Sequence, residues 1–481
     1  MVYFCSKLKL EKVCNLSQLK LEKVQTTKCQ IYMKRKIYKQ MLDWKNKSKG
    51  TTALLIEGAR RIGKSYIVRE FAEREYKSSI LVDFNDMDDE LLGIFEHYLH
   101  NRNDFFIRLS VYFGVKLYER ESVIIFDEVQ LYPKARAAIK YLVADGRYDY
   151  IETGSLVSLR QNVKDIVIPS EEESIDMFPM DFEEFLWAMN EEMLVDFIRN
   201  QYESQAPMGG LHRKAYDLLR LYMIVGGMPQ AVLAYSKTKD FDEVDRVKRA
   251  ILRLYRNDIS KYASQTETKV TRIFDDIPSQ LQRHEKKFRI SAIQQGGKMR
   301  DYEDAFFWLD DSRVINICYN STEPNVGLRL NMDRTTLKCF MGDTGLLIAH
   351  AFDENTIADT QLYRKLMLGK LEINQGMLVE NLVAQMLRAS GHRLFFFSRS
   401  DREDAENRME IDFLIRKASV TSRHNIIPIE VKSTNRYTHV SLDKFRKKYS
   451  EYVASPIVLH SGDVMTKDGV TYLPLYMAML L

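Results

Sequence analysis

Hydrophobic runs alternate with amphipathic stretches through the first third of the chain. Four short apolar runs lead into glycine, polar or acidic residues, at 53–56, 79–84, 122–128 and 148–155. Three helical stretches separate them, at 66–76, 95–118 and 134–145. Short, nearly continuous apolar runs are typical of strands that are buried on both faces of a parallel sheet. We therefore predict an α/β domain over residues 33–190, built on a parallel sheet.

The pattern changes twice farther along the chain. Residues 191–265 are helical in pattern, with a break at 225–229, and we assign them to a helical lid. Two helices and a strand follow, at 272–282, 302–309 and 314–319. This order resembles a winged helix, which we place at 266–330.

Residues 331–481 mix strand-like runs with an amphipathic helix at 376–388. The predicted strands lie at 337–343, 393–398, 410–415 and 426–433. Residues 1–32 differ from the rest, because a KLKLEKV segment recurs there as QLKLEKV. We expect little order in this extension, which is either an amphipathic basic arm or a stretch upstream of a natural start at Met33.

The first apolar run leads into a phosphate-binding motif. Gly58, Gly63, Lys64 and Ser65 fit the pattern G-x-x-x-x-G-K-[ST] between a strand and a helix. The glycines let backbone N–H groups approach phosphate oxygens, and the following helix directs its positive end at the same anion. Lys64 would neutralise phosphate charge, and Ser65 would ligate Mg²⁺. The predicted nucleotide-binding run is Gly58, Ala59, Arg60, Arg61, Ile62, Gly63, Lys64 and Ser65.

The third run, at 122–128, ends in Asp127 and Glu128. Ligands lie at the carboxyl ends of parallel strands, so both acids are expected beside the phosphate loop. We predict that Asp127 holds Mg²⁺ and that Glu128 polarises the attacking water. Lys64, Asp127 and Glu128 are thus the predicted catalytic residues, with ATP and Mg²⁺ as the implied cofactors.

The fourth run ends in Thr153-Gly154-Ser155. A phosphate loop, an acid-tipped strand and then a polar-tipped strand resemble the AAA-type ATPases, in which a sensor residue occupies the last position. The resemblance implies that Thr153 or Ser155 senses the γ-phosphate.

More of the chain resembles one prokaryotic group of AAA-type ATP-binding proteins whose C-terminal domain has no assigned function. The matching stretches are GARRIGKS, IIFDEVQLYPKA, TGSLVSL, MFPMDFEEFLWA, GGMPQAV and LYRNDISKYA, in that order. One departure is the acidic IPSEEESIDMFPM, where many relatives carry Gly-Arg. An arginine for the γ-phosphate cannot be carried over from there, and Arg253 and Arg256 are weak substitutes.

The C-terminal region carries Asp412 and then Glu430-Val431-Lys432, which fits the D…(E/D)-x-K pattern. A period of two places Glu430 and Lys432 on one strand face, where Asp412 from a neighbouring strand can join them. Two carboxylates would bind Mg²⁺, with Lys432 stabilising phosphate charge. Glu380 would add a helical acid. The region resembles restriction-endonuclease-like (PD-(D/E)XK) folds, and charged alternation on a half-exposed strand is the alternative.

Composition sets limits on partners. The net charge of +4 comes from residues 1–32, with six Lys and two Glu; elsewhere basic and acidic residues are equal in number. Nucleic-acid affinity therefore needs a local patch, such as the basic stretch 284–300. Five scattered cysteines and the lack of a long apolar run favour a reduced, cytoplasmic protein without a membrane segment.

Two hypotheses follow. The first is an Mg²⁺-dependent ATPase whose hydrolysis drives or gates movement of a nuclease-like domain on a partner such as DNA. The second is a nucleotide-switched binding module with negligible hydrolysis and an inactive nuclease-like domain. An ATPase that takes an arginine from a neighbouring copy would act only as a homo-oligomer.

Overall fold

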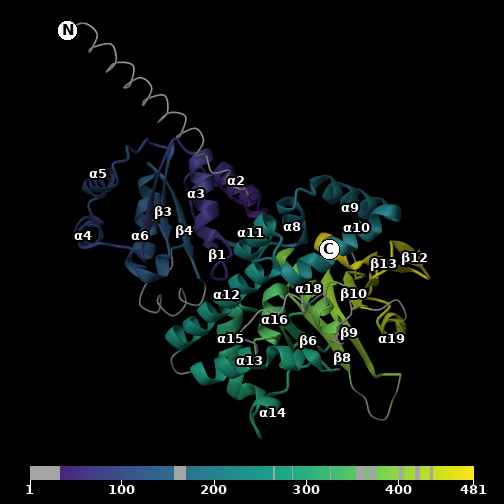
Figure 1. The fold of residues 1–481 in the computed structure, drawn as a ribbon. Coiled ribbons are helices and arrows are strands. Elements are labelled where there is room, and N and C mark those ends of the chain that lie inside the picture. Colours follow the sequence, from purple (N-terminus) through teal and green to yellow (C-terminus); the bar gives the residue numbers. More distant parts are fainter. Residues whose placement is uncertain are drawn as a thin grey trace, which may run out of the picture. The chain divides into compact units, whose positions relative to one another are not determined.

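Two β-sheets organise the part of the chain that the computed structural model describes (Figure 1). The described residues are 33–155, 169–263, 266–283, 285–325, 327–353, 363, 365, 367, 375–399, 404, 406–417, 423–433 and 437–481. The predicted extension at 1–32 lies outside them. Residues 35–481 cluster as one compact unit.

The first sheet has five parallel strands in the order β2-β3-β4-β1-β5. Their bounds are β1 Ala53–Glu57, β2 Ser78–Asp83, β3 Ser122–Asp127, β4 Asp149–Gly154 and β5 Glu172–Asp176. The four strands expected from apolar runs are confirmed as β1 to β4. Every residue of β3 and β4 is buried, as expected for strands covered on both faces.

Helices connect these strands. Their bounds are α2 Ile37–Ser48, α3 Lys64–Glu75, α4 Asp89–Tyr98, α5 Arg102–Phe113 and α6 Pro133–Asp145. The stretch 95–118, expected to be mostly helical, holds the end of α4 and the whole of α5. Asp88 caps the start of α4 by accepting from the Leu91 amide, and Gly114, in a left-handed conformation, ends α5.

The edge strand β5 was not expected, because its sequence, EESID, is rich in glutamate. It pairs along its length with β1, from Ala53 opposite Glu172 to Glu57 opposite Asp176. Arg136 of α6 donates to both carboxylate oxygens of Glu172, at 3.0 and 2.7 Å. Charged side chains suit an edge strand, and here one of them also anchors the neighbouring helix.

A group of helices follows the first sheet. Their bounds are α8 Phe182–Ala188, α9 Glu192–Ser204, α10 His212–Val225, α11 Pro229–Thr238, α12 Phe241–Tyr262 and α13 Glu267–Gln282. The predicted break falls between α10 and α11, where the Gly227 amide donates to Asp343 at 2.5 Å. A Cβ on Gly227 would lie 2.0 Å from the Met180 carbonyl oxygen, so this turn requires glycine.

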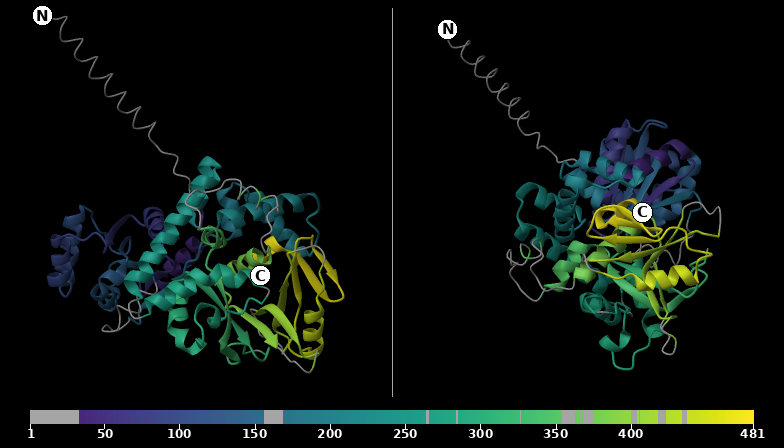
Figure 2. Two further views of the ribbon diagram at one scale, coloured as in Figure 1. Left: turned by 60° about the horizontal axis from the view of Figure 1, so that its bottom comes forward. Right: turned by 90° about the vertical axis from the view of Figure 1, so that its right-hand side faces the viewer.

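The second sheet has eight strands in the order β12-β13-β11-β10-β9-β8-β6-β7 (Figure 2, green to yellow). The strand bounds are β6 Ile315–Ser321, β7 Met332–Met341, β8 Phe395–Arg399, β9 Met409–Arg416, β10 Ile426–Val431, β11 Ile457–His460, β12 Met465–Lys467 and β13 Val470–Pro474. The helices of this region are α14 Ile290–Ile293, α15 Glu303–Asp311, α16 Thr344–Ala351, α18 Gln375–Ala389 and α19 Val440–Lys448.

The hairpin β6–β7 belongs to this second sheet. Besides pairing with β7, β6 runs parallel to β8, with Tyr319 opposite Phe395. The sequence placed a boundary at 330/331 and assigned β6 to a winged helix. The structure instead joins the strands on both sides of that boundary, because β6 completes its hydrogen bonding with a C-terminal strand.

Among the described residues, no single helix is long and apolar enough to cross a membrane. Residues 209–225 and 229–238 meet that test only together, as a pair bent by 119°.

Candidate functional site

The loop between β1 and α3 has the backbone conformation that its glycines predict. Gly58 and Gly63 have φ of 153° and 96°, and α3 begins at Lys64 as expected. A Cβ on Gly58 would lie 2.2 Å from the Met177 carbonyl oxygen. Within the loop, Ala59 and Ile62 are buried, whereas Arg60 and Arg61 are exposed. The Ile62 carbonyl accepts a 2.8 Å hydrogen bond from Arg35.

Lys64 is buried and turned onto its own loop. Its Nζ donates to the carbonyl oxygens of Gly58 and Ala59, both at 2.9 Å. Burial lowers the pKa of Lys64 below its ordinary value, although the nearby carboxylates of Glu128 and Asp127 oppose that effect. A charged group whose hydrogen bonds go to neutral carbonyls gains from an anionic ligand.

Asp127, Ser65 and Thr153 meet beside the loop. Asp127 is buried at the carboxyl end of β3, and its Oδ1 accepts from Ser65 Oγ at 3.0 Å and from Thr153 Oγ1. The strand order explains this meeting, because β4 lies between β1 and β3 and so brings Thr153 between the two motifs. A carboxylate and a hydroxyl so close together fit a hard cation such as Mg²⁺, which prefers oxygen ligands.

Glu128 follows directly, in an unusual conformation. Its φ of 56° and ψ of 44° lie in the left-handed region, and its amide donates to Thr153 Oγ1 at 3.4 Å. The Glu128 carboxylate accepts from the Gln130 side chain. A non-glycine residue in this region costs free energy and is held in place by its surroundings, often at functional sites.

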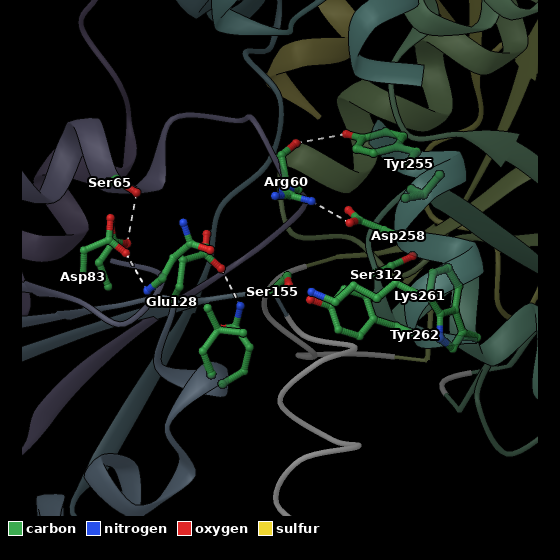
Figure 3. A pocket seen from close by; sticks show the side chains of 16 residues that line it. Arg60, Ser65, Asp83, Glu128, Ser155, Tyr255, Asp258, Lys261, Tyr262 and Ser312 are labelled. Carbon is green, nitrogen blue, oxygen red and sulfur yellow. Dashed lines mark hydrogen bonds and ion pairs between the residues drawn. The ribbon is translucent and has the colours of Figure 1, made fainter. Parts of the chain in front are cut away.

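A pocket of about 240 Å³ opens over these residues (Figure 3). Ser65, Asp127, Glu128 and Ser155 line one side. The opposite side comes from α12, α15 and the segment that follows α15, and its residues are Tyr255, Asp258, Lys261, Tyr262, Trp308, Ser312 and Val314. Sequence analysis missed this second side, because the residues come from segments far from the motifs.

One ion pair joins the loop to α12. Arg60 Nη1 lies 2.5 Å from Asp258 Oδ1, and the Tyr255 hydroxyl donates to the Arg60 carbonyl at 3.1 Å (Figure 3). Burial raises the pKa of Asp258, and Arg60 opposes that rise. Asp258 thus holds an arginine that would otherwise be available to phosphate.

The arginines suggested as substitutes lie elsewhere. Arg253 is exposed, and Arg256 pairs with Asp353 at 2.7 Å and Asp275 at 3.3 Å. Neither belongs to the pocket lining, where Lys261 supplies the cation of α12.

The structure brings the four predicted nuclease-site residues together: Asp412 on β9, Glu430 on β10, Lys432 just after β10, and Glu380 on α18. Glu430 and Lys432 lie on one face, 2.5 Å apart, and Asp412 Oδ2 accepts from the Val431 amide at 2.9 Å. Glu380 of α18 is buried, and Asp412 is close enough to raise its pKa further after burial. The hairpin of two strands predicted here is confirmed as β9 and β10, which are antiparallel.

Sequence analysis missed the lysine at the centre of this cluster. Lys338 of β7 is 1% exposed, and its Nζ lies 3.0 Å from Glu410, 3.6 Å from Asp412 and 3.9 Å from Glu380. A second lysine, Lys286, pairs with Glu380 from the basic stretch that we considered for DNA. In the sequence, Lys338 could have been noticed as a single charged residue inside the apolar run LKCFM.

Family models match three parts of the chain. Residues 50–186 match an AAA domain, residues 216–356 a domain of unknown function (DUF8612), and residues 375–477 another domain of unknown function (DUF4143). Residues 50–186 are therefore similar to AAA domains. The second match runs across both predicted boundaries, 265/266 and 330/331. A search of curated proteins found no match.

Solved structures give weak likenesses. A Walker-type ATPase, paby2304, of Pyrococcus abyssi is 14% identical, with a TM-score of 0.41, over 66% of this chain and 96% of that one. Cdc6p from Pyrobaculum aerophilum is 11% identical, with a TM-score of 0.24, over 71% and 97%. With TM-scores below 0.5, we draw neither fold nor function from them.

Proposed function

We propose that the AAA-type domain binds ATP with Mg²⁺ and hydrolyses it. One observation carries the proposal: the phosphate loop, the Ser65–Asp127 pair and Glu128 meet at the carboxyl edge of three adjacent strands, β1, β4 and β3. The backbone and Lys64 would hold the phosphates, with Arg60 and Arg61 beside them. Ser65 and Asp127 would hold Mg²⁺, which supplies charge neutralisation when bound.

Glu128 takes the role of the base in this proposal. Its strained backbone directs the carboxylate into the pocket, where it can accept a proton from a water molecule. Thr153 and Ser155 lie at the end of β4, between the loop and Glu128, and would sense the terminal phosphate.

The test is Mg²⁺-dependent ATP hydrolysis by the full chain and by Glu128→Gln. We expect turnover to fall about 100-fold or more, with ATP binding retained, because the amide cannot accept the proton. Glu121→Gln, on the exposed carboxylate that pairs with Lys77, is the matched control and should hydrolyse ATP normally. Undiminished turnover in Glu128→Gln would remove Glu128 from the proposal.

A nucleotide-switched module is the second candidate, and the Arg60–Asp258 pair favours it. This pair ties the loop to α12, so that bound phosphate would compete with Asp258 for Arg60. ATP binding without turnover, at every protein concentration, supports the switch. Turnover that rises steeply with concentration supports an ATPase completed by a second copy.

Duplex DNA is added in a further arm of the same assay, because the first hypothesis names DNA as the partner. The contacts of the basic stretch lend it little support. Lys286, Lys287 and Arg289 pair with Glu380, Glu410 and Glu285 respectively. Stimulation of hydrolysis by duplex DNA, lost in Glu128→Gln, would link DNA to the ATPase.

A further inference from the structure

The restriction-endonuclease-like resemblance implies a divalent cation at Asp412 and Glu430, so the C-terminal cluster must be tested for one. We define this C-terminal cluster as eight residues: Glu380, Glu410, Asp412, Glu430, Lys286, Lys287, Lys338 and Lys432. We infer that it takes no divalent cation, because lysines of the same chain already hold the position and balance the charge that the cation would need.

Lys338 holds the central position. Three carboxylates from two elements, β9 and α18, converge on its ammonium group at 3.0 to 3.9 Å. A Mg²⁺ ion would need oxygen ligands at about 2.0–2.1 Å in octahedral geometry. The carboxylates surround an ammonium instead, and among the described residues no three His, Cys, Asp or Glu side chains group to hold a metal.

Lys338 is fixed in that position. It lies within β7, opposite Cys318 of β6, and its side chain is almost fully buried. Burial alone would lower the pKa of Lys338, but Glu410, Glu380 and Asp412 raise it by more, so the side chain stays charged. A metal ion entering the cluster would have to displace a buried cation that three carboxylates hold.

Lys286 and Lys287, from the basic stretch 284–300, contact two carboxylates of the cluster. Lys286 pairs with Glu380 Oε1, and Lys287 lies 3.9 Å from Glu410 Oε2. The segment is tied to β7 by a bridge between Lys287 and Lys338 and by the Phe288 amide, which donates to the Leu337 carbonyl at 2.8 Å. This backbone pairing holds both lysines at the carboxylates.

The charges of the cluster balance. Four carboxylates face four lysines, and Asp412 Oδ2 also accepts from the Val431 amide. Two buried oxygens, Glu380 Oε2 and Glu430 Oε2, make no hydrogen bond, but each faces an ammonium, of Lys338 and Lys432 respectively. Two further positive charges in this buried place would be uncompensated.

The experiment measures Mn²⁺ binding to the full chain without nucleotide, by calorimetry and by the loss of the free-ion electron paramagnetic resonance signal. All variants carry Asp127→Asn, so the phosphate-loop site contributes nothing and the result is independent of ATP hydrolysis. We expect this parent, its Asp412→Asn variant and its Glu410→Gln variant to bind the same number of Mn²⁺ ions. A parent that binds one more ion than the Asp412→Asn variant would overturn the inference.

The converse experiment opens the cluster. Lys338→Met with Lys286→Met leaves the carboxylates without their central cations, and we expect one new Mn²⁺ site that Asp412→Asn abolishes again. A folded double variant that gains no site would overturn the role given to the lysines. Thermal melting establishes whether it folds; if it does not, the comparison of the parent with Asp412→Asn decides alone.

Discussion

The phosphate-loop site and the C-terminal cluster each bury a lysine, but the partners differ. Lys64 donates to two carbonyl oxygens, its neighbour Ser65 lines the pocket, and the pKa of Lys64 is lowered. Lys338 faces three carboxylates, and its pKa is raised. A buried cation with neutral partners is poised for an anionic ligand, whereas one matched by carboxylates is already compensated. The comparison separates a binding site from a structural ion-pair network.

Lys338→Ala should give the largest effect on stability. Removing it leaves Glu380, Glu410 and Asp412 as neighbouring carboxylates without their central cation, and we expect the free energy of unfolding to fall by about 3–5 kcal/mol. Urea denaturation of the full chain measures it. Lys77→Ala is the control, because Lys77 forms an exposed pair with Glu121 and its removal should leave the midpoint unchanged. Equal midpoints for both variants would contradict the comparison.

Lys64→Met should do the opposite of Lys338→Ala: it should weaken ATP binding strongly and change the stability of the chain little. We expect ATP affinity to fall at least about 100-fold, roughly 2.7 kcal/mol, because the phosphates lose their buried cation. Stability without nucleotide should change by no more than about 1 kcal/mol, since the lost hydrogen bonds go to neutral carbonyls. Nucleotide titration and urea denaturation measure the two quantities. Tight ATP binding by the variant would exclude Lys64 as the phosphate ligand.

The sequence predicts the phosphate-loop site well, because its backbone conformation and chemistry reside in one continuous run. The start of α3 at Lys64 and the acids that end β3 follow from local pattern alone. Asp127 and Thr153 come together because parallel strands present their carboxyl ends at one edge. The strand order that makes Thr153 a neighbour of both motifs comes from the structure, in which β4 lies between β3 and β1.

Three other features, the C-terminal cluster, the pairing of β6 with β8 and the strand β5, depend on contacts between segments that are distant in the sequence. The D…(E/D)-x-K pattern supplies Asp412, Glu430 and Lys432, but the cation at the centre comes from β7, which the pattern does not include. The pairing of β6 with β8 likewise crosses the predicted domain boundary. The glutamate-rich β5 has little strand propensity, so its pairing with β1 overrides the local sequence.

Lys248 of α12 is intermediate between Lys64 and Lys338, because it has a carbonyl partner and also carboxylates nearby. It is fully buried and donates to the Ile224 carbonyl at 2.8 Å, and burial lowers its pKa to about 8, although Asp245 and Asp343 oppose this. From about pH 8 up to the ordinary lysine pKa, the unfolded chain binds the proton and the folded chain does not. Stability contributed by this residue must therefore rise with pH in that window.

The measurement compares the free energy of unfolding of the natural chain with that of Lys248→Met. Between about pH 8 and pH 10, the natural chain should gain roughly 2 kcal/mol relative to the variant. Below about pH 7 the difference should be constant. A difference that stays constant across this window and falls only above the ordinary lysine pKa would mean that Asp245 holds Lys248 in a compensated pair, as the carboxylates hold Lys338.

Asp258→Ala should produce the smallest effect, an increase in ATP affinity of about 2–5-fold. The Arg60–Asp258 pair is half-exposed, and pairs of this kind contribute up to about 1 kcal/mol. Without Asp258, Arg60 is free to bind phosphate, and the loss of a carboxylate from the pocket also reduces its repulsion of ATP.

A double-mutant cycle with Arg60→Ala separates the two causes, because only the first vanishes when Arg60 is absent. Asp217→Ala, on an exposed pair with Arg220 outside the pocket lining, is the control. Weaker ATP binding by Asp258→Ala would show that the pair holds the phosphate loop in its binding conformation rather than competing with the ligand.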